Sequence, residues 1–177
     1  NRPGYAAVFR AEDIGPTVRS VQRGDLLFCT GEHRSVQCED VKNTVPVPDS
    51  VSPQTASLCR LMAVGMAALD TTMARSGDPV LVTGAGPVGY LAAHVFARCG
   101  YDVHVVDPDE ERRRFVADSG LEQVHATMPL DDACLRGHVA LVLECAGHEQ
   151  AAVEGARMVR PGGEVVLVGQ PWTRKTE

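Results

Sequence analysis

The sequence predicts an α/β protein in which a parallel, doubly wound sheet of about five strands follows a smaller β-rich segment. Two observations carry this prediction. From Asp78 onward, short apolar runs alternate with helical patterns of about ten residues, which is typical of parallel strand–helix–strand units. Before residue 50 the chain instead contains short β-prone pieces between glycine and proline turns, too little to close into a domain of its own.

The β-rich segment, residues 1–50, contains four β-prone pieces bounded by turn signals. We expect strands at Tyr5–Phe9, Thr17–Val21, Asp25–Cys29 and Arg34–Cys38.

A helix should connect the two parts within residues 51–77. Ser52 is a hydroxyl cap, and Pro53 suits the first helical position. The apolar spacing continues through Leu69, and the glycine in Ser76-Gly77 predicts the helix end.

Residues 78–177 should form the doubly wound domain. The expected strands are Pro79–Thr83, Asp102–Val106, Glu122–Ala126, Val139–Glu144 and Glu164–Val168. The expected helices are Pro87–Cys99, Asp109–Ser119 and Glu149–Val159, the first two ended by glycines.

Composition and charge exclude several classes of protein. The chain has 177 residues, a net charge of −6 and no block of like charge, which argues against a nucleic-acid or membrane-surface binder. No stretch reaches the roughly 18 apolar residues of a membrane-spanning helix. The six cysteines form no C-x-x-C pair, so we expect reduced thiols in a cytoplasmic protein. The opening Asn1-Arg2-Pro3-Gly4 has neither Met nor a leader pattern, so we expect a piece of a longer protein or a trimmed chain.

A glycine loop follows the first strand of this domain and opens its first helix. Gly84 permits a tight turn, Gly86 leaves room for a pyrophosphate against the backbone, and Gly89 allows close packing of the helix on the sheet. The amides at the start of the helix would hold the phosphate charge. The residues expected to bind the dinucleotide here are Thr83, Gly84, Gly86, Pro87, Val88 and Gly89. The alternative is a turn that only links strand and helix.

Asp107 ends the next strand, 18 residues after Gly89, where an acid is expected to bind the adenosine ribose. Its carboxylate would repel a 2′-phosphate, which favours NAD(H) over NADP(H). Arg112 could lie over the adenine or pair with Asp107. Two alternatives stay open: Asp107 as a helix cap, and Arg112–Arg114 either as a solvated helix face or as enough charge to accept NADP(H).

The loops after two later strands should border the same ligand, because ligands bind at the carboxyl ends of parallel strands. This adds Cys145, Ala146 and Gly147, followed by Gly169 and Gln170. Small residues at these places also suit an ordinary tight turn.

The order of these motifs resembles the medium-chain dehydrogenase/reductase superfamily of the alcohol, sorbitol and threonine dehydrogenase type. The likeness rests on the Arg23-Gly24-Asp25 turn, the segment from Val45 to Asp49, the glycine loop, Glu144–Gly147 and Arg160–Gly163. It implies a partial GroES-like catalytic domain followed by a Rossmann domain without its sixth strand, in a chain about half as long as complete members. It also allows a homodimer.

The resemblance fails at the zinc ligands. Zinc-type members have Gly-His-Glu where this chain has Gly4-Tyr5-Ala6, and no cysteine-rich lobe is present. Cys59 falls near the family's last catalytic zinc ligand but has no partners in the sequence. We therefore expect no metal site and no bound zinc, and treat His33 and His148 as surface or hydrogen-bonded histidines.

The leading hypothesis is an NAD(H)-dependent oxidoreductase that transfers hydride to or from a small alcohol, carbonyl or activated alkene, without catalytic zinc. No general acid is evident; Tyr5 and Cys59 are the only candidates near the expected catalytic cleft. The rival is a non-catalytic NAD-binding module. A methyltransferase fits less well, because Thr83 replaces the acid that such proteins carry before the first glycine.

Overall fold

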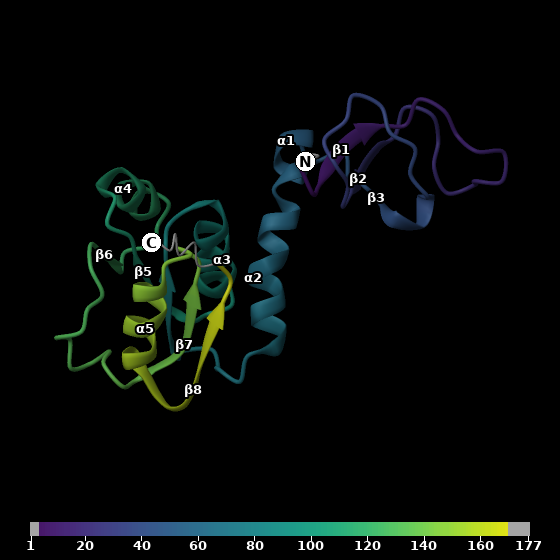
Figure 1. Cartoon of the computed structure of the whole chain (residues 1–177). Helices are drawn as coiled ribbons and strands as arrows, with labels where there is room; N and C mark the ends of the chain where they lie inside the picture. The colour runs from purple at the N-terminus through teal and green to yellow at the C-terminus, as the bar shows by residue number, and fades with distance from the viewer. Residues whose placement is uncertain (1–3, 170–177) are drawn as a thin grey trace, which may run out of the picture. The chain divides into compact units, whose positions relative to one another are not determined.

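The computed structural model describes residues 4–169, which divide into two compact units, one ending at Arg60 and one beginning at Leu61 (Figure 1). Each unit has its own sheet. The domain boundaries expected from the sequence stay a prediction.

The first unit contains a three-stranded antiparallel sheet in the order β1-β2-β3. Its strands are β1 (Ala7–Arg10), β2 (Leu26–Cys29) and β3 (Thr44–Pro46). The predicted strands at Thr17–Val21 and Arg34–Cys38 are wrong, since both stretches are turns or irregular. Both sides of β2 are taken by β1 and by β3, a strand not predicted from the sequence, so neither stretch pairs with β2.

The prediction of a single connecting helix is also wrong, because the structure has two helices here. The first, α1 (Pro53–Ser57), starts as predicted: the Ser52 hydroxyl accepts from the amide of Thr55 at 3.1 Å. After a break at Leu58, α2 runs over Cys59–Thr71 and stops short of the predicted end. Just beyond its end, the Glu164 carboxylate accepts from the hydroxyl of Thr72 and from the amide of Met73, so this amide is bonded outside the helix.

The second unit is built on a parallel five-stranded sheet in the order β6-β5-β4-β7-β8, which confirms the predicted fold class. Its strands are β4 (Pro79–Thr83), β5 (Asp102–Val106), β6 (Val124–His125), β7 (Val139–Glu144) and β8 (Val159–Leu167). The first, second and fourth of these have the predicted bounds. Strand β8 starts earlier than predicted, so that residues 160–163 lie within it, and its pairing with β7 has an irregularity between Val139 and Leu141.

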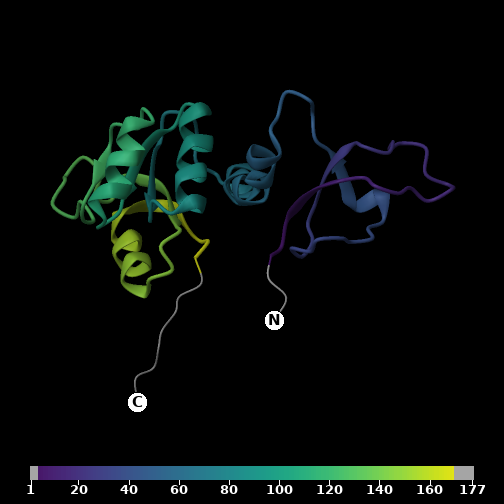
Figure 2. The same ribbon diagram turned by 90° about the horizontal axis from the view of Figure 1, so that it is seen from above.

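Helices cover both faces of this sheet. They are α3 (Pro87–Arg98), α4 (Glu110–Asp118) and α5 (Glu149–Met158). Phe96 of α3, Val116 of α4 and Ala68 of α2 share one buried cluster with alternate residues of the strands. Met158 of α5 packs on the other face with Leu81. Figure 2 shows α3 and α5 on opposite sides of the sheet.

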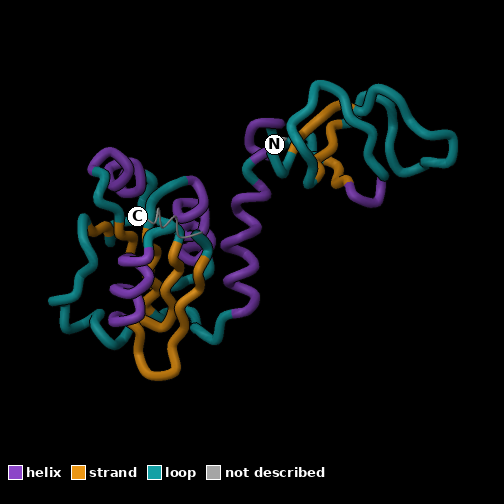
Figure 3. The backbone as a smooth tube through the Cα atoms, in the orientation of Figure 1, coloured by secondary structure: helices purple, strands orange, loops and turns teal. Residues whose placement is uncertain are grey.

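Two features of this architecture position the site. The chain leaves β4 for β5 on one side and later returns to pair β7 on the other side, so the switch point of a doubly wound sheet lies at the carboxyl end of β4. Between β6 and β7 residues 126–138 form turns instead of a helix (Figure 3). The loops at the carboxyl ends of β4, β5 and β7 therefore meet at the expected ligand-binding edge.

Candidate functional site

The glycine loop joins β4 to α3 in the predicted strand–turn–helix context. Gly84 has a φ of 86°, a conformation that favours glycine, and Gly86 is the residue just before the helix, with Pro87 in its first turn. No side chain caps this helix end, whereas Asp109 caps α4 through the amides of Glu111 and Arg112. The first amides of α3 are thus left to an external acceptor.

The three glycines meet different surroundings. A Cβ on Gly89 would overlap the carbonyl oxygen of Gly84, and a Cβ on Gly84 would lie 2.8 Å from the Cα of Ala146. A Cβ on Gly86 would meet nothing within 4 Å. The fold itself therefore demands glycine at the first and third positions. At Gly86 the backbone faces open space, which is what close approach of a ligand requires.

Asp107 is 2% exposed and joins the end of β5 to the glycine loop. Its carboxylate accepts from the amide of Ala85 at 2.7 Å and from the amide of Asp109 at 2.9 Å. The alternative in which Asp107 caps α4 is wrong, because Asp109 does so.

The three arginines that follow have separate partners. The Nη1 of Arg112 lies 3.7 Å from the Asp107 carboxylate, which is one of the two arrangements left open for this side chain. Arg113 donates to the main-chain carbonyl of Asp107 at 2.7 Å, and Arg114 pairs with Glu110 on the helix surface. The guanidinium of Arg112 is thus the one that balances the buried acid.

A cavity of about 520 Å³ opens where these loops meet. Among the predicted cofactor residues, it is lined by Thr83, Gly84, Gly86, Asp107, Arg112, Cys145 and Ala146. Pro87, Val88, Gly89, Gly147 and Gly169 belong to the same loops but do not line the cavity, and Gln170 lies outside the described residues. Two segments of the wall were not expected: Ala126–Met128 with Leu130, and the start of α5 with His148, Gln150 and Glu154.

The position of His148 had a usable signal in the sequence. It directly follows Gly147, in a loop already assigned to the ligand edge, and it is the residue before α5. The 126–130 wall had no such signal, because its place depends on pairing of the short strand β6 with β5.

Cys145 is unsuited to act as a nucleophile. Burial, and after it the charge of Glu144, raises the pKa of the Cys145 thiol to about 12, so the group stays protonated near neutral pH. Its main-chain amide donates to the carbonyl of Thr83 at 2.9 Å. Cys145 thus contributes surface and backbone to the cavity.

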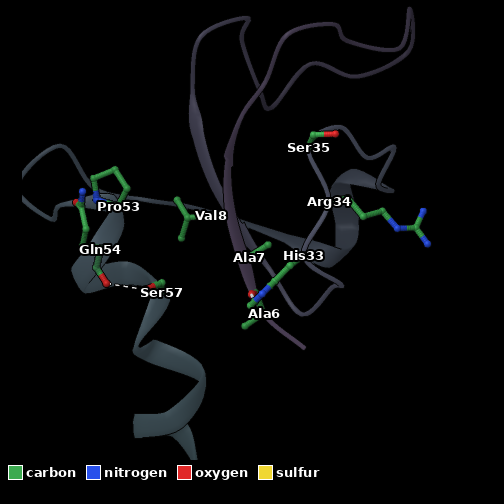
Figure 4. Close-up of a pocket in the computed structure, with 9 residues that line it drawn as sticks. All are labelled: Ala6, Ala7, Val8, His33, Arg34, Ser35, Pro53, Gln54 and Ser57. Carbon is green, nitrogen blue, oxygen red and sulfur yellow. Dashed lines mark hydrogen bonds between the residues drawn. The ribbon is translucent and has the colours of Figure 1, made fainter. Parts of the chain in front are cut away.

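A second hollow, of about 580 Å³, lies within the first unit between β1 and α1 (Figure 4). His33 projects into it, but its Nε2 is engaged with the carbonyl of Ala6 at 3.0 Å, and Ser57 donates to the carbonyl of Gln54. Of the polar side chains that Figure 4 shows here, His33 and Ser57 are thus bonded to local backbone, and Arg34 donates to the Glu32 carboxylate.

The residues near the expected zinc position do not form a ligand set. Tyr5 is 59% exposed, and the guanidinium of Arg60, next to Cys59, lies 5.9 Å from its ring centre. The positive charge of this guanidinium disfavours a zinc ion beside the phenol. Within residues 4–169, no three His, Cys, Asp or Glu side chains come together as a metal site would require.

The comparisons with known proteins agree with this fold. A model of the zinc-binding dehydrogenase family matches residues 87–176. The chain is 34% identical over 135 residues to L-galactonate-5-dehydrogenase of Escherichia coli K12, covering 73% of this chain and 39% of the relative. It is 33% identical over 205 residues to L-threonine 3-dehydrogenase of Thermococcus kodakarensis, covering 94% and 58%.

Similar solved structures are those of dehydrogenases and reductases. Galactitol-1-phosphate dehydrogenase from Escherichia coli superimposes with a TM-score of 0.80 at 19% identity, over 95% of this chain and 59% of that one. Acetophenone reductase from Geotrichum candidum, in complex with NAD, gives 0.66 at 22% identity, over 74% and 38%. A structure from Sinorhizobium meliloti 1021 bound to NADP gives 0.78 at 19% identity, over 96% and 61%.

The chain therefore belongs to the zinc-binding dehydrogenase family, within the medium-chain dehydrogenase/reductase superfamily. It spans between 39% and 58% of the length of the two relatives named above. Among the helices of the described segment, none is both long and apolar enough to cross a membrane.

Proposed function

We propose that this chain carries the dinucleotide site of an NAD(H)-dependent oxidoreductase, which transfers hydride to or from a small alcohol, carbonyl or activated alkene without catalytic zinc. The observation that carries the proposal is the open space at Gly86, at the uncapped start of α3, on the wall of the 520 Å³ cavity.

The chain's own residues account for binding of the pyrophosphate. The amides of Val88 and Gly89 at the start of α3, with the positive end of the helix dipole, would hold the phosphate charge. Gly86 would let the phosphates reach the backbone, and Ala146 would close the opposite side of the loop. When bound, the nicotinamide supplies the hydride chemistry, while the protein orients it and excludes water.

Asp107 supports NAD(H) in preference to NADP(H). Its carboxylate is held in place by two amides and lies on the cavity wall, where it would accept from the ribose hydroxyls and repel a 2′-phosphate. Arg112 lies beside it as a partial counterweight. Since similar structures hold NAD in one case and NADP in another, the preference rests on this carboxylate.

The Tyr5–Arg60 pair supports the absence of catalytic zinc. Tyr5 is the one phenol of the first unit and remains a candidate proton donor; Cys59 is the weaker candidate. In such a reductase, positioning of the substrate against the nicotinamide supplies much of the rate. We also propose a cytoplasmic location, because the six cysteines are unpaired thiols, and the homodimer stays a prediction.

The test is to titrate the full protein with NADH and NADPH by nicotinamide fluorescence, then to screen alcohols, aldehydes, ketones and enones for turnover. We expect saturable NADH binding, turnover of one substrate class and less than one zinc per chain by metal analysis. NADH binding without turnover on any class would favour the non-catalytic module instead. Failure to bind either dinucleotide would contradict the proposal itself.

A further inference from the structure

We infer that Glu144 is a positioning residue that sets the shape of the dinucleotide cavity by holding the loop after β7. This inference rests on the proposed function for its consequence, which is cofactor affinity. Its structural basis is independent of any ligand.

The Glu144 carboxylate is buried, with 1% of the residue exposed, at the carboxyl end of β7, which lies between β4 and β8 in the sheet. Its Oε1 accepts from the amide of Ala146 at 2.9 Å and from the amide of Gly147 at 2.8 Å. The hydroxyl of Thr83, at the end of β4, lies 3.4 Å from the same oxygen. Taking a carboxylate out of water is costly unless hydrogen bonds compensate, and here they come from the backbone of the cavity wall.

Two further segments pack against the 145–147 loop that this carboxylate holds. The glycine loop touches Ala146, since a Cβ on Gly84 would lie 2.8 Å from the amide nitrogen of that residue. The end of β8 closes in from the other side, where a Cβ on Gly169 would lie 2.9 Å from the Oε2 of Glu144 and would overlap Gly147. Such close packing leaves no slack, so a shift of the 145–147 loop would move the wall against the glycine loop.

The consequence concerns the ligand as well as the fold. Cys145 and Ala146 line the cavity, and the amides of Ala146 and Gly147 point to Glu144 instead of to the cavity. They are therefore withheld from cofactor phosphates, which leaves the start of α3 as the anion site. Without the carboxylate, the amides of Ala146 and Gly147 would lose their shared acceptor. The 145–147 loop could then shift, and its two amides would become available to an anion.

The experiment compares Glu144→Ala and Glu144→Gln in the full chain. Glutamine keeps one carbonyl oxygen that can accept both amides, whereas alanine keeps none. We expect Glu144→Ala to weaken NADH binding at least about tenfold and Glu144→Gln to stay within about threefold of the unaltered protein. Val139→Ala, at the opposite end of the same buried strand, is the control: it should lower the Tm while leaving the NADH affinity unchanged.

A second readout needs no cofactor. Amide hydrogen exchange in the ligand-free protein should be faster at Ala146 and Gly147 in Glu144→Ala than in Val139→Ala, and near the unaltered rate in Glu144→Gln. Unchanged exchange at these two amides would overturn the role of Glu144, whatever NADH does. Equal loss of affinity in the glutamine and alanine variants would also overturn it, since charge rather than hydrogen bonding would then matter. Lack of NADH binding by the unaltered protein, with the exchange result as expected, would contradict the proposed function alone.

Discussion

At the scale of single residues, the packing of the fold requires the residue type at some positions of the candidate site and not at others. Gly84 and Gly89 are required by the packing of the loop itself. Gly86 meets no neighbour, so the fold gives no reason for glycine there. Asp107 serves both the fold and the cavity: its carboxylate accepts from the amide of Ala85 in the glycine loop, and it also lines the cavity.

Replacing Gly86 with valine should therefore leave the fold intact and remove dinucleotide binding. The added side chain fits the ligand-free protein but occupies the space that a pyrophosphate would need. We expect about 100-fold weaker NADH binding, equivalent to about 2.7 kcal/mol, with a Tm close to that of the unaltered protein. Gly15→Val, in an exposed loop of the other unit, is the matched control. Unchanged NADH affinity in Gly86→Val would show that the loop does not bind phosphate.

Replacing Asp107 with asparagine should change the choice of cofactor. Loss of the charge weakens the ribose hydrogen bonds and removes the repulsion of a 2′-phosphate, so the NADH preference should shrink by about 10-fold or more. Fluorescence titration with both dinucleotides measures the ratio. Asp109→Asn makes the same change of charge two residues away and preserves the α4 cap, so its ratio should not move. An unaltered ratio in Asp107→Asn would refute the assignment.

At the scale of elements, the sheet edge at β5 and β6 carries a histidine pair beside the cavity wall. His104 is buried and its Nδ1 lies 3.1 Å from the Nε2 of His125, while its Nε2 lies 3.3 Å from the Asp102 carboxylate. Burial, and after it the neighbouring His104, lowers the pKa of His125, although Asp132 acts in the opposite direction. Proton uptake by His125 is thus disfavoured in the folded edge strand β6.

This pair predicts acid sensitivity of the fold. The unfolded chain takes up a proton at His125 near its ordinary pKa of about 6.5, whereas the folded chain resists until lower pH. The stability is therefore complete above about pH 6.5 and falls as the pH decreases toward the folded pKa. Burial also lowers the pKa of His94, which adds to the effect.

We expect the Tm to drop between about pH 7.5 and about pH 5.5 and the drop to be smaller in His125→Gln. Thermal unfolding followed by circular dichroism at the two pH values measures it. His138→Gln, which changes an exposed histidine, should keep the full drop. An equal drop in His125→Gln would contradict the coupling.

The strands of the parallel sheet are predicted from the sequence more accurately than those of the small antiparallel sheet. The strands β4, β5 and β7 are short apolar runs between strong turn residues, and each is buried on both faces, so local pattern and tertiary burial agree. The small sheet offers no such agreement. Thr17–Val21 and Arg34–Cys38 have strand-like composition without a partner, while Thr44–Pro46, which ends in proline, pairs with β2.

At the scale of the whole molecule, the residues that line the 520 Å³ cavity all lie between Thr83 and Glu154, within the unit that begins at Leu61. The sequence located this site through its glycine loop, its acid and the small residues after β7. It did not locate the wall at 126–130, because that wall exists only once β6 has paired with the edge of the sheet. Dinucleotide binding should thus belong to one unit.

A fragment from Cys59 to Glu177 should accordingly bind NADH within about threefold of the affinity of the full chain. The fragment keeps α2, whose Ala68 belongs to the core of that unit. Circular dichroism would establish that it is folded, and fluorescence titration would give the affinity. Loss of binding by a folded fragment would show that the first unit contributes directly to the cofactor site.

The central claim, that the cavity at the carboxyl ends of β4, β5 and β7 binds NAD(H), is tested most directly by titrating the full protein with NADH and NADPH in parallel. The structure predicts saturable binding of one NADH per chain, at least about tenfold tighter than NADPH, because a fixed carboxylate lies where the 2′-phosphate would go. Absence of saturable binding, or tighter binding of NADPH, would contradict the claim.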